Sequence, residues 1–154
     1  MPAFLLIRRD DVNWPYLLNS FEGRIGRQTF WISFTAVVII EIMAHLLAFR
    51  IEGERLSSIV NLAFAYPEFA IFAKRGHDRN MPIWAPGAFF AIGVLMDFLV
   101  IFGLIRENEE PGALTLVILV LWSVFMFALL LDLGFRKGTR GPNRYGPDPL
   151  AGHT

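Results

Sequence analysis

Four long apolar stretches constrain the fold of this chain more than any other feature of its sequence. They cover residues 29–49, 56–73, 83–105 and 113–135, and each has roughly the 20 residues that cross the hydrocarbon core of a bilayer. The chain has 154 residues, of which 55% are hydrophobic and 18% charged, so few polar side chains remain to cover these stretches in water. Backbone groups in lipid must be paired within their own segment, which favours helices. The sequence therefore predicts an all-α integral membrane protein, a four-transmembrane-helix bundle.

The connections between the spans are short and predict an up-and-down bundle with both termini on one side. They cover residues 50–55, 74–82 and 106–112. Eleven basic residues fall on the side of the termini and three on the other, so the positive-inside rule predicts that both termini are cytoplasmic. The eleven are Arg8, Arg9, Arg24, Arg27, Lys74, Arg75, Arg79, Arg136, Lys137, Arg140 and Arg144, and the three are Arg50, Arg55 and Arg106.

Length and composition predict one domain with short flanking segments. Residues 1–20 are expected to form a cytoplasmic segment, residues 21–149 the membrane domain with a basic Gly/Pro tail, and residues 150–154 a disordered end. The apolar run at residues 4–7 is too short for a signal-peptide core, so the N-terminus is expected to be retained. The chain has no cysteine and three histidines, and we expect no metal site and no cofactor. Its zero formal net charge indicates no nucleic-acid partner.

Three polar segments on the predicted cytoplasmic side carry recognisable motifs. They read FEGRIGRQTFW at residues 21–31, KRGHDRNMPIW at 74–84 and GTRGPNRYGPDP at 138–149. They resemble the bacterial inner-membrane family called domain of unknown function 805, and the resemblance implies a multi-pass protein of the inner membrane without implying a reaction. The residues that carry it are Phe21, Gly23, Arg24, Arg27, Phe30, Trp31, Pro67, Arg75, His77, Asp78, Trp84 and nearly all of residues 138–149, whereas Gly76, Pro82 and Ala85 depart from the family pattern.

The arginines of these motifs are candidates for contact with anions. Arg24 and Arg27 are three residues apart and would share one face of a helix. One interpretation is a general anchor to anionic lipid, worth about 1 kcal/mol per basic residue. The alternative is a specific anion or headgroup pocket on which Arg24, Arg27, Arg75 and Arg144 converge.

Four further residues are predicted to build a cytoplasmic cap: His77, Asp78, Asn143 and Tyr145. His77 and Asp78 are adjacent and could act as an acid–base pair, but two neighbours on a loop are better explained by structural hydrogen bonds. Asn143 is expected to close a turn, and Arg144 to pair with an acid such as Asp78. Prolines and glycines reduce the entropy lost when the tail is immobilised, so we expect the tail to fold back onto the loops.

Each span also contains one carboxylate, which is expensive in lipid and by default indicates function. Glu68 and Asp132 lie near the cytoplasmic ends of their spans and are expected to pair with basic residues there or to reach the membrane interface. Glu41 and Asp97 lie at similar depths, roughly 18 and 21 Å from those ends, and His45 shares a helix face with Glu41. A cluster of Glu41, His45 and Asp97 could relay protons, bind a cation, or act as a polar clasp between helices.

These observations predict a non-enzymatic accessory, scaffold or lipid-contacting component of the bacterial inner membrane. The alternative function is a proton- or cation-coupled transporter or channel that uses the acids inside the spans, and a third is a lipid-modifying enzyme. The expected partners are anionic membrane lipids, together with a protein partner or further copies of the chain.

Overall fold

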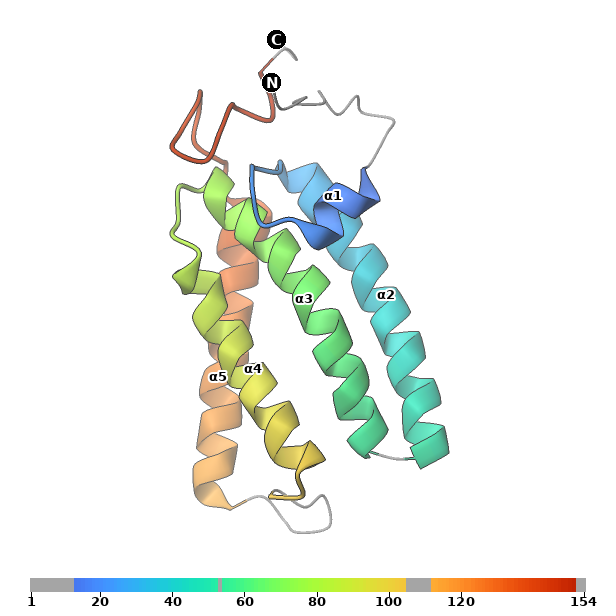
Figure 1. Ribbon diagram of the computed structural model, residues 1–154. Helices are drawn as coiled ribbons and strands as arrows, with labels where there is room; N and C mark the ends of the chain where they lie inside the picture. Colours follow the sequence, from blue (N-terminus) through green and yellow to red (C-terminus); the bar gives the residue numbers. More distant parts are fainter. Residues whose placement is uncertain (1–12, 53, 105–111, 152–154) are drawn as a thin grey trace.

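In the part of the chain that the structure describes, the fold consists of four long helices and one short helix (Figure 1). The computed structural model describes residues 13–52, 54–104 and 112–151, without the side chains of residues 52 and 54. The helices are α1 (Trp14–Asn19), α2 (Arg27–Glu52), α3 (Glu54–Asp78), α4 (Trp84–Ile101) and α5 (Ala113–Phe135). Helices α2 to α5 are each long and apolar enough to cross a membrane, which confirms the predicted all-helical, four-span architecture.

Helix α3 lies at the centre of the bundle, between α2 on one side and α4 with α5 on the other (Figure 1). Many large apolar side chains of the long helices point outward, among them Leu46, Val120 and Phe127, which are 58%, 61% and 64% exposed. Such surfaces would be costly in water over a whole bundle, whereas lipid covers them at no cost. The outward faces therefore fit the membrane assignment.

The best-buried side chains gather at the end of the bundle where α1 lies. Phe30 and Phe72 are fully buried and their ring centroids lie 5.4 Å apart, in edge-to-face contact. Leu17 of α1 and Leu133 of α5 are also fully buried in this cluster. Helix α1 and the segment that follows α5 close this end, so its core is shielded from solvent by protein.

The helices extend beyond several of the predicted spans and into the predicted connections. Helix α3 continues to Asp78, so the first half of the predicted loop at residues 74–82 is helical. Only residue 53 separates α2 from α3, where the sequence predicted a link over residues 50–55. Helix α4 ends at Ile101, and the last predicted residue of that span, together with nearly all of the following connection, lies outside the described residues.

Helix α1 was not predicted, because the pattern of residues 1–20 indicated no regular element. Its start has ordinary capping chemistry: the Asn13 side chain accepts a hydrogen bond from the Tyr16 amide at 3.1 Å, and Pro15 lies in the first turn. A helix of six residues has little stability of its own and depends on what it packs against. Residues 1–12 lie outside the described part of the chain.

The segment that follows α5, residues 136–151, folds back over the ends of α2 and α3 (Figure 1). We call it the tail. The Thr139 amide donates to the Asp78 carbonyl at 2.8 Å, which confirms the predicted folding back. Asn143 and Gly146 exchange backbone hydrogen bonds of 3.0 Å, and the Asn143 side chain accepts from the Tyr145 amide at 2.9 Å. Asn143 thus closes a turn as predicted. Of the predicted disordered end at 150–154, residues 150 and 151 are described, and their amides donate to Asp148 at 2.9 and 3.0 Å, while residues 152–154 lie outside the described part of the chain.

Candidate functional site

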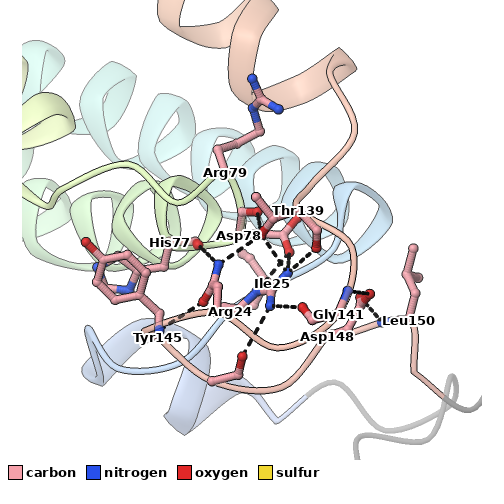
Figure 2. A network of polar contacts seen from close by, with 12 residues as sticks. Arg24, Ile25, His77, Asp78, Arg79, Thr139, Gly141, Tyr145, Asp148 and Leu150 are labelled. Atoms are coloured by element: carbon pink, nitrogen blue, oxygen red, sulfur yellow. Dashed lines mark hydrogen bonds and ion pairs between the residues drawn. The ribbon is translucent and has the colours of Figure 1, made fainter.

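The centre of the closed end is the carboxylate of Asp78, which is 4% exposed (Figure 2). Its Oδ1 atom accepts hydrogen bonds from Nη2 and Nε of Arg24 at 2.9 and 3.2 Å. Its Oδ2 atom accepts from Arg75, one turn earlier on α3. We call this end the polar cap: residues 20–26, residues 74–81 and the tail. One buried carboxylate thus binds two buried guanidinium groups that come from different segments.

Arg24 connects the segment before α2 with the tail. Its guanidinium donates to the carbonyls of Thr139, Gly141 and Gly146 at 2.6, 2.8 and 3.2 Å, in addition to its bonds to Asp78 (Figure 2). The Arg24 side chain is 1% exposed. Because a guanidinium has five N–H donors in a fixed plane, it can satisfy this many acceptors at once, and a lysine could not.

Arg75 connects α3 with the end of α5. It is fully buried, and it donates to the carbonyls of Leu133 and Arg136, each at 2.6 Å. Carbonyl groups at a helix C-terminus lack partners within the helix, and the helix dipole favours a positive charge there. Arg75 therefore stabilises the end of α5 and holds Asp78 at the same time.

His77 is immobilised by contacts on three sides. Its Nδ1 lies 3.1 Å from the Gly23 carbonyl, so that nitrogen carries the proton, and its ring stacks on Tyr145 at 3.8 Å. Asn143 donates to the His77 carbonyl at 2.9 Å. The Nε2 atom is buried and has no hydrogen-bond partner among the described residues. Since the Asp78 carboxylate binds the two arginines, the structure does not show an ion pair between His77 and Asp78.

Lys74 is a cap residue that the sequence pattern did not single out. It is fully buried, and its Nζ donates to the carbonyls of Tyr16, Leu17 and Ser20, with distances of 3.1 and 2.7 Å to the first two. These carbonyls lie at the end of α1, so the ammonium group caps that helix. No local pattern around Lys74 could have revealed this role, because α1 itself was not predicted.

The other two candidate arginines lie apart from the Asp78 centre. Arg27 is exposed and donates to the Phe135 carbonyl at 3.1 Å. Arg144 is also exposed; it donates to the Asn80 carbonyl at 3.3 Å and lies over the Tyr145 ring at 4.7 Å. The expected pairing of Arg144 with Asp78 was therefore wrong, because Arg24 and Arg75 already occupy both oxygens of that carboxylate.

A pocket of about 320 Å³ opens between the start of α2 and the tail, and we call it the basic pocket. Its four basic residues outnumber its two acidic residues, and one of those acids, Asp78, is already neutralised by Arg24 and Arg75. Among the described residues, neither Lys137 nor Arg140 forms a salt bridge. The lining residues are Gly26, Arg27, Arg75, Asp78, Lys137, Gly138, Thr139, Arg140, Asp148 and Leu150.

Asp148 is the second acid of the basic pocket, and it shapes the tail. Its carboxylate accepts from the amides of Leu150 and Gly141 at 2.9 and 2.8 Å (Figure 2). The amide of Leu150, followed by that of Gly141, holds the pKa of Asp148 below its ordinary value, against the opposing effect of burial. The carboxylate therefore supports the tail at neutral pH, and this support is lost as the pH falls through the lowered pKa.

A second hollow, of about 400 Å³, lies between the four long helices, and we call it the interhelical cavity. Glu41 of α2, Asn61 and Glu68 of α3, and Asp97 of α4 contribute its polar lining. Asn61 donates to Oδ1 of Asp97 at 3.3 Å, and the Ser58 hydroxyl lies near this carboxyl. Most of the remaining lining is apolar: Phe34, Val38, Ala65, Phe89, Phe90, Ile92, Val94, Met96, Ile118, Leu119, Trp122 and Met126.

The cavity brings together a different set of acids from the one predicted. Glu68 was expected to pair with a basic residue near the end of its span or to reach the interface. Among the described residues it forms no salt bridge, and it lines the cavity beside Glu41, since Lys74 is occupied by α1. His45 lies within electrostatic reach of Glu41 and Asp97 but is not among the lining residues. Asp132, in contrast, pairs as predicted, with Arg136 at 2.6 Å and Arg79 at 3.3 Å.

The fold and the polar cap together define a class, a multi-pass helical membrane protein with one closed polar end. Comparison with known proteins gives the family. Residues 18–147 match the family described as "Protein of unknown function (DUF805)", and the chain belongs to this family. The match covers the first two motifs that carried the resemblance in the sequence and all but the last two residues of the third.

Two curated relatives cover most of the chain. The chain is 32% identical over 143 residues to "Uncharacterized protein YiiR" of Escherichia coli strain K12, with 85% of this chain and 86% of the relative covered. The protein of the same name from Escherichia coli O157:H7 matches with the same identity and coverage. No solved structure matches the chain.

Proposed function

We propose that the protein is a non-enzymatic, lipid-contacting component of the bacterial cytoplasmic membrane, and that its polar cap binds the headgroups of anionic lipids. The observation that carries this proposal is the basic pocket, where Arg27, Lys137 and Arg140 are exposed. The pocket lies between the first turn of α2 and the residues just after α5. These are the ends of two apolar spans, which is the level at which phosphate headgroups lie.

The internal chemistry of the cap also favours a binding role over catalysis. Asp78 binds Arg24 and Arg75, and the ring of His77 is held between the Gly23 carbonyl and Tyr145. A general base must reach the proton that it abstracts, and His77 does not line the basic pocket. The exposed basic side chains of the basic pocket are the ones that can bind an external anion. A guanidinium there can bind a phosphate through two parallel hydrogen bonds.

Orientation is part of this proposal, since the cap must face the cytoplasmic leaflet. We expect reporter fusions after Thr154 to report a cytoplasmic location and fusions after Glu110 a periplasmic one, because the basic residues are distributed eleven to three between the two sides. Alkaline phosphatase and green fluorescent protein give opposite signals at each site and control for one another. The reverse pattern would place the cap outside and would contradict the proposal.

Removing two pocket cations should weaken the binding of anionic lipid. We expect Lys137→Gln/Arg140→Gln to retain several-fold less phosphatidylglycerol than the wild type, because each basic residue near a lipid surface contributes about 1 kcal/mol. Retained lipid is measured by native mass spectrometry after purification in mild detergent. Arg50→Gln/Arg55→Gln removes the same charge at the opposite end of the bundle and is the matched control. Equal lipid retention in the two double variants would contradict a headgroup site in the basic pocket.

A second candidate function, coupled transport of protons or cations, is favoured by the interhelical cavity. Its carboxyls come from α2, α3 and α4, three of the spans that would have to move relative to one another in a transporter. Buried carboxyls inside spans commonly mark ion pathways. The flux of protons into proteoliposomes after a pH jump separates this function from that of a scaffold.

A further inference from the structure

The interhelical cavity combines a size, an aromatic wall and a set of carboxyls that together specify a ligand. Its volume of about 400 Å³ lies within the range of small-molecule sites in proteins. All four long helices line it. It is separate from the basic pocket, and the two share no lining residue.

Aromatic rings form one wall of the cavity. Phe89 and Trp122 stack with ring centroids 4.6 Å apart, and the Trp122 Nε1 donates to the Phe89 carbonyl at 3.4 Å, which fixes the indole in place. Phe90 is held against Phe72 and Phe69, with centroids 5.4 Å away in both cases. Rings fixed in this way present a flat apolar surface and an electron-rich face, both of which attract organic cations.

The carboxyls of the cavity have neutral neighbours where a cation would be expected. Asp97 accepts a hydrogen bond from Asn61 and lies near the Ser58 hydroxyl, and neither neighbour carries a positive charge. Glu41 and Glu68 lie within electrostatic reach of each other, and among the described residues neither forms a salt bridge with a basic group. No lysine, arginine or histidine is among the described residues that line the cavity, although His45, on α2, lies within electrostatic reach of Glu41 and Asp97.

The arrangement suits an organic cation better than a bare metal ion. Within the described residues, no three histidine or acidic side chains are close enough together to hold a metal. A metal ion also needs its ligands within about 2–2.6 Å, whereas most of this lining is hydrocarbon. A ligand with an apolar body and one positive charge would match both parts of the lining, since the rings cover the body and the carboxyls balance the charge.

We infer that the interhelical cavity binds an amphipathic organic cation, a protonated or quaternary amine with an aromatic or alkyl body. The amine lies toward Glu68 and Asp97, and the apolar body lies against Phe89 and Trp122. If the protein is a transporter, this cation would be the class of substrate that it carries, and only that step rests on the second candidate function. Binding of the cation in the cavity does not require transport. It does not depend on the binding of headgroups at the polar cap.

The test uses the full chain in nanodiscs of zwitterionic phosphatidylcholine, which carry no anionic lipid to attract a cation. The probe is radiolabelled benzyltrimethylammonium, measured by equilibrium dialysis. We expect saturable binding that unlabelled benzyltrimethylammonium displaces and that neutral benzyl alcohol at the same concentration leaves in place. Absence of saturable binding, or equal displacement by benzyl alcohol, would overturn the inference.

Two pairs of variants locate the site. Asp97→Asn is expected to weaken binding by about tenfold or more, since it removes an attraction between opposite charges in a medium of low polarity. Asp132→Asn removes a carboxylate of the same type that lies outside the cavity, and should bind as the wild type does. Ala65→Leu fills the cavity and leaves every carboxyl in place, so it should also abolish binding. Its control is Ala63→Leu, on the exposed face of the same helix.

The outcomes separate this inference from both functions above. Binding that is lost in Ala65→Leu and kept in Ala63→Leu supports the inference even if Asp97→Asn fails to fold. Binding that persists in Ala65→Leu contradicts it. If the wild type binds the probe but proteoliposomes show no flux driven by pH, transport fails and the site stands. If protons move while the probe does not bind, the inference fails and transport remains.

Discussion

Replacing Asp78 with asparagine should strongly destabilise the protein, by about 3–5 kcal/mol. The variant keeps the shape of the side chain but leaves Arg24 and Arg75 buried without a counter-charge. Both arginines would then have to draw water into the cap or leave it. Because Arg24 also holds three tail carbonyls, the tail should be released together with the charge pair.

Two measurements check this result. Thermal unfolding in mild detergent should show the lower stability, and trypsin applied to inverted membranes should cut after Arg140 and Arg144 much faster than in the wild type. Asp132→Asn is the control, because that carboxylate is 22% exposed and binds Arg136 and Arg79, which are 69% and 21% exposed, so neither partner is fully buried and the loss should be smaller. Similar cutting rates in the wild type and Asp78→Asn would mean that the ion pairs do not hold the tail.

The substitution Gly138→Ala should cost somewhat less than Asp78→Asn, about 3 kcal/mol, because the cap has no room for a methyl group at this position. A Cβ atom at residue 138 would overlap the carboxylate of Asp78, which two guanidinium groups hold in place. The tail would have to shift and lose the Thr139 bonds to the Asp78 carbonyl. The same trypsin digestion and thermal unfolding measure the outcome.

Gly112→Ala is the matched control, since none of the described residues lies within 4 Å of a Cβ atom there. A double variant sharpens the test. If Gly138→Ala acts by displacing Asp78, its effect should shrink in an Asp78→Asn background, because residues in one network are not additive. Full additivity of the two losses would show that Gly138 acts through some other contact.

The two proposed sites differ in how much of each could be foreseen. Arg27 and Arg75, both candidates for anion contact from the sequence, line the basic pocket, but Lys137 and Arg140 were predicted only to set the orientation in the membrane. Glu41 and Asp97 line the interhelical cavity as their matched depth suggested, whereas Glu68 and Asn61 were not expected there. The missing members come from helix α3, whose rotation about its axis no local pattern predicted.

The sequence by itself determined the properties that depend on residues close together along the chain. Four apolar runs are enough to predict four membrane-spanning helices, because lipid and backbone hydrogen bonding leave few alternatives. The turn at Asn143 could likewise be predicted, because it rests on a bond between a side chain and an amide two residues on. The family resemblance could also be found from the sequence, because each motif consists of residues that are close together along the chain.

Only the tertiary structure decided which charges meet. Arg24 and Asp78 are 54 residues apart, and Arg24 and Gly141 are 117 apart, so no spacing in the sequence encodes their contact. The sequence placed Lys74 in a loop, whereas in the structure its ammonium group donates to three carbonyls at the end of helix α1. A buried charge takes the partners that the packing of the helices brings within reach, because leaving it unpaired costs more than any local preference can offset.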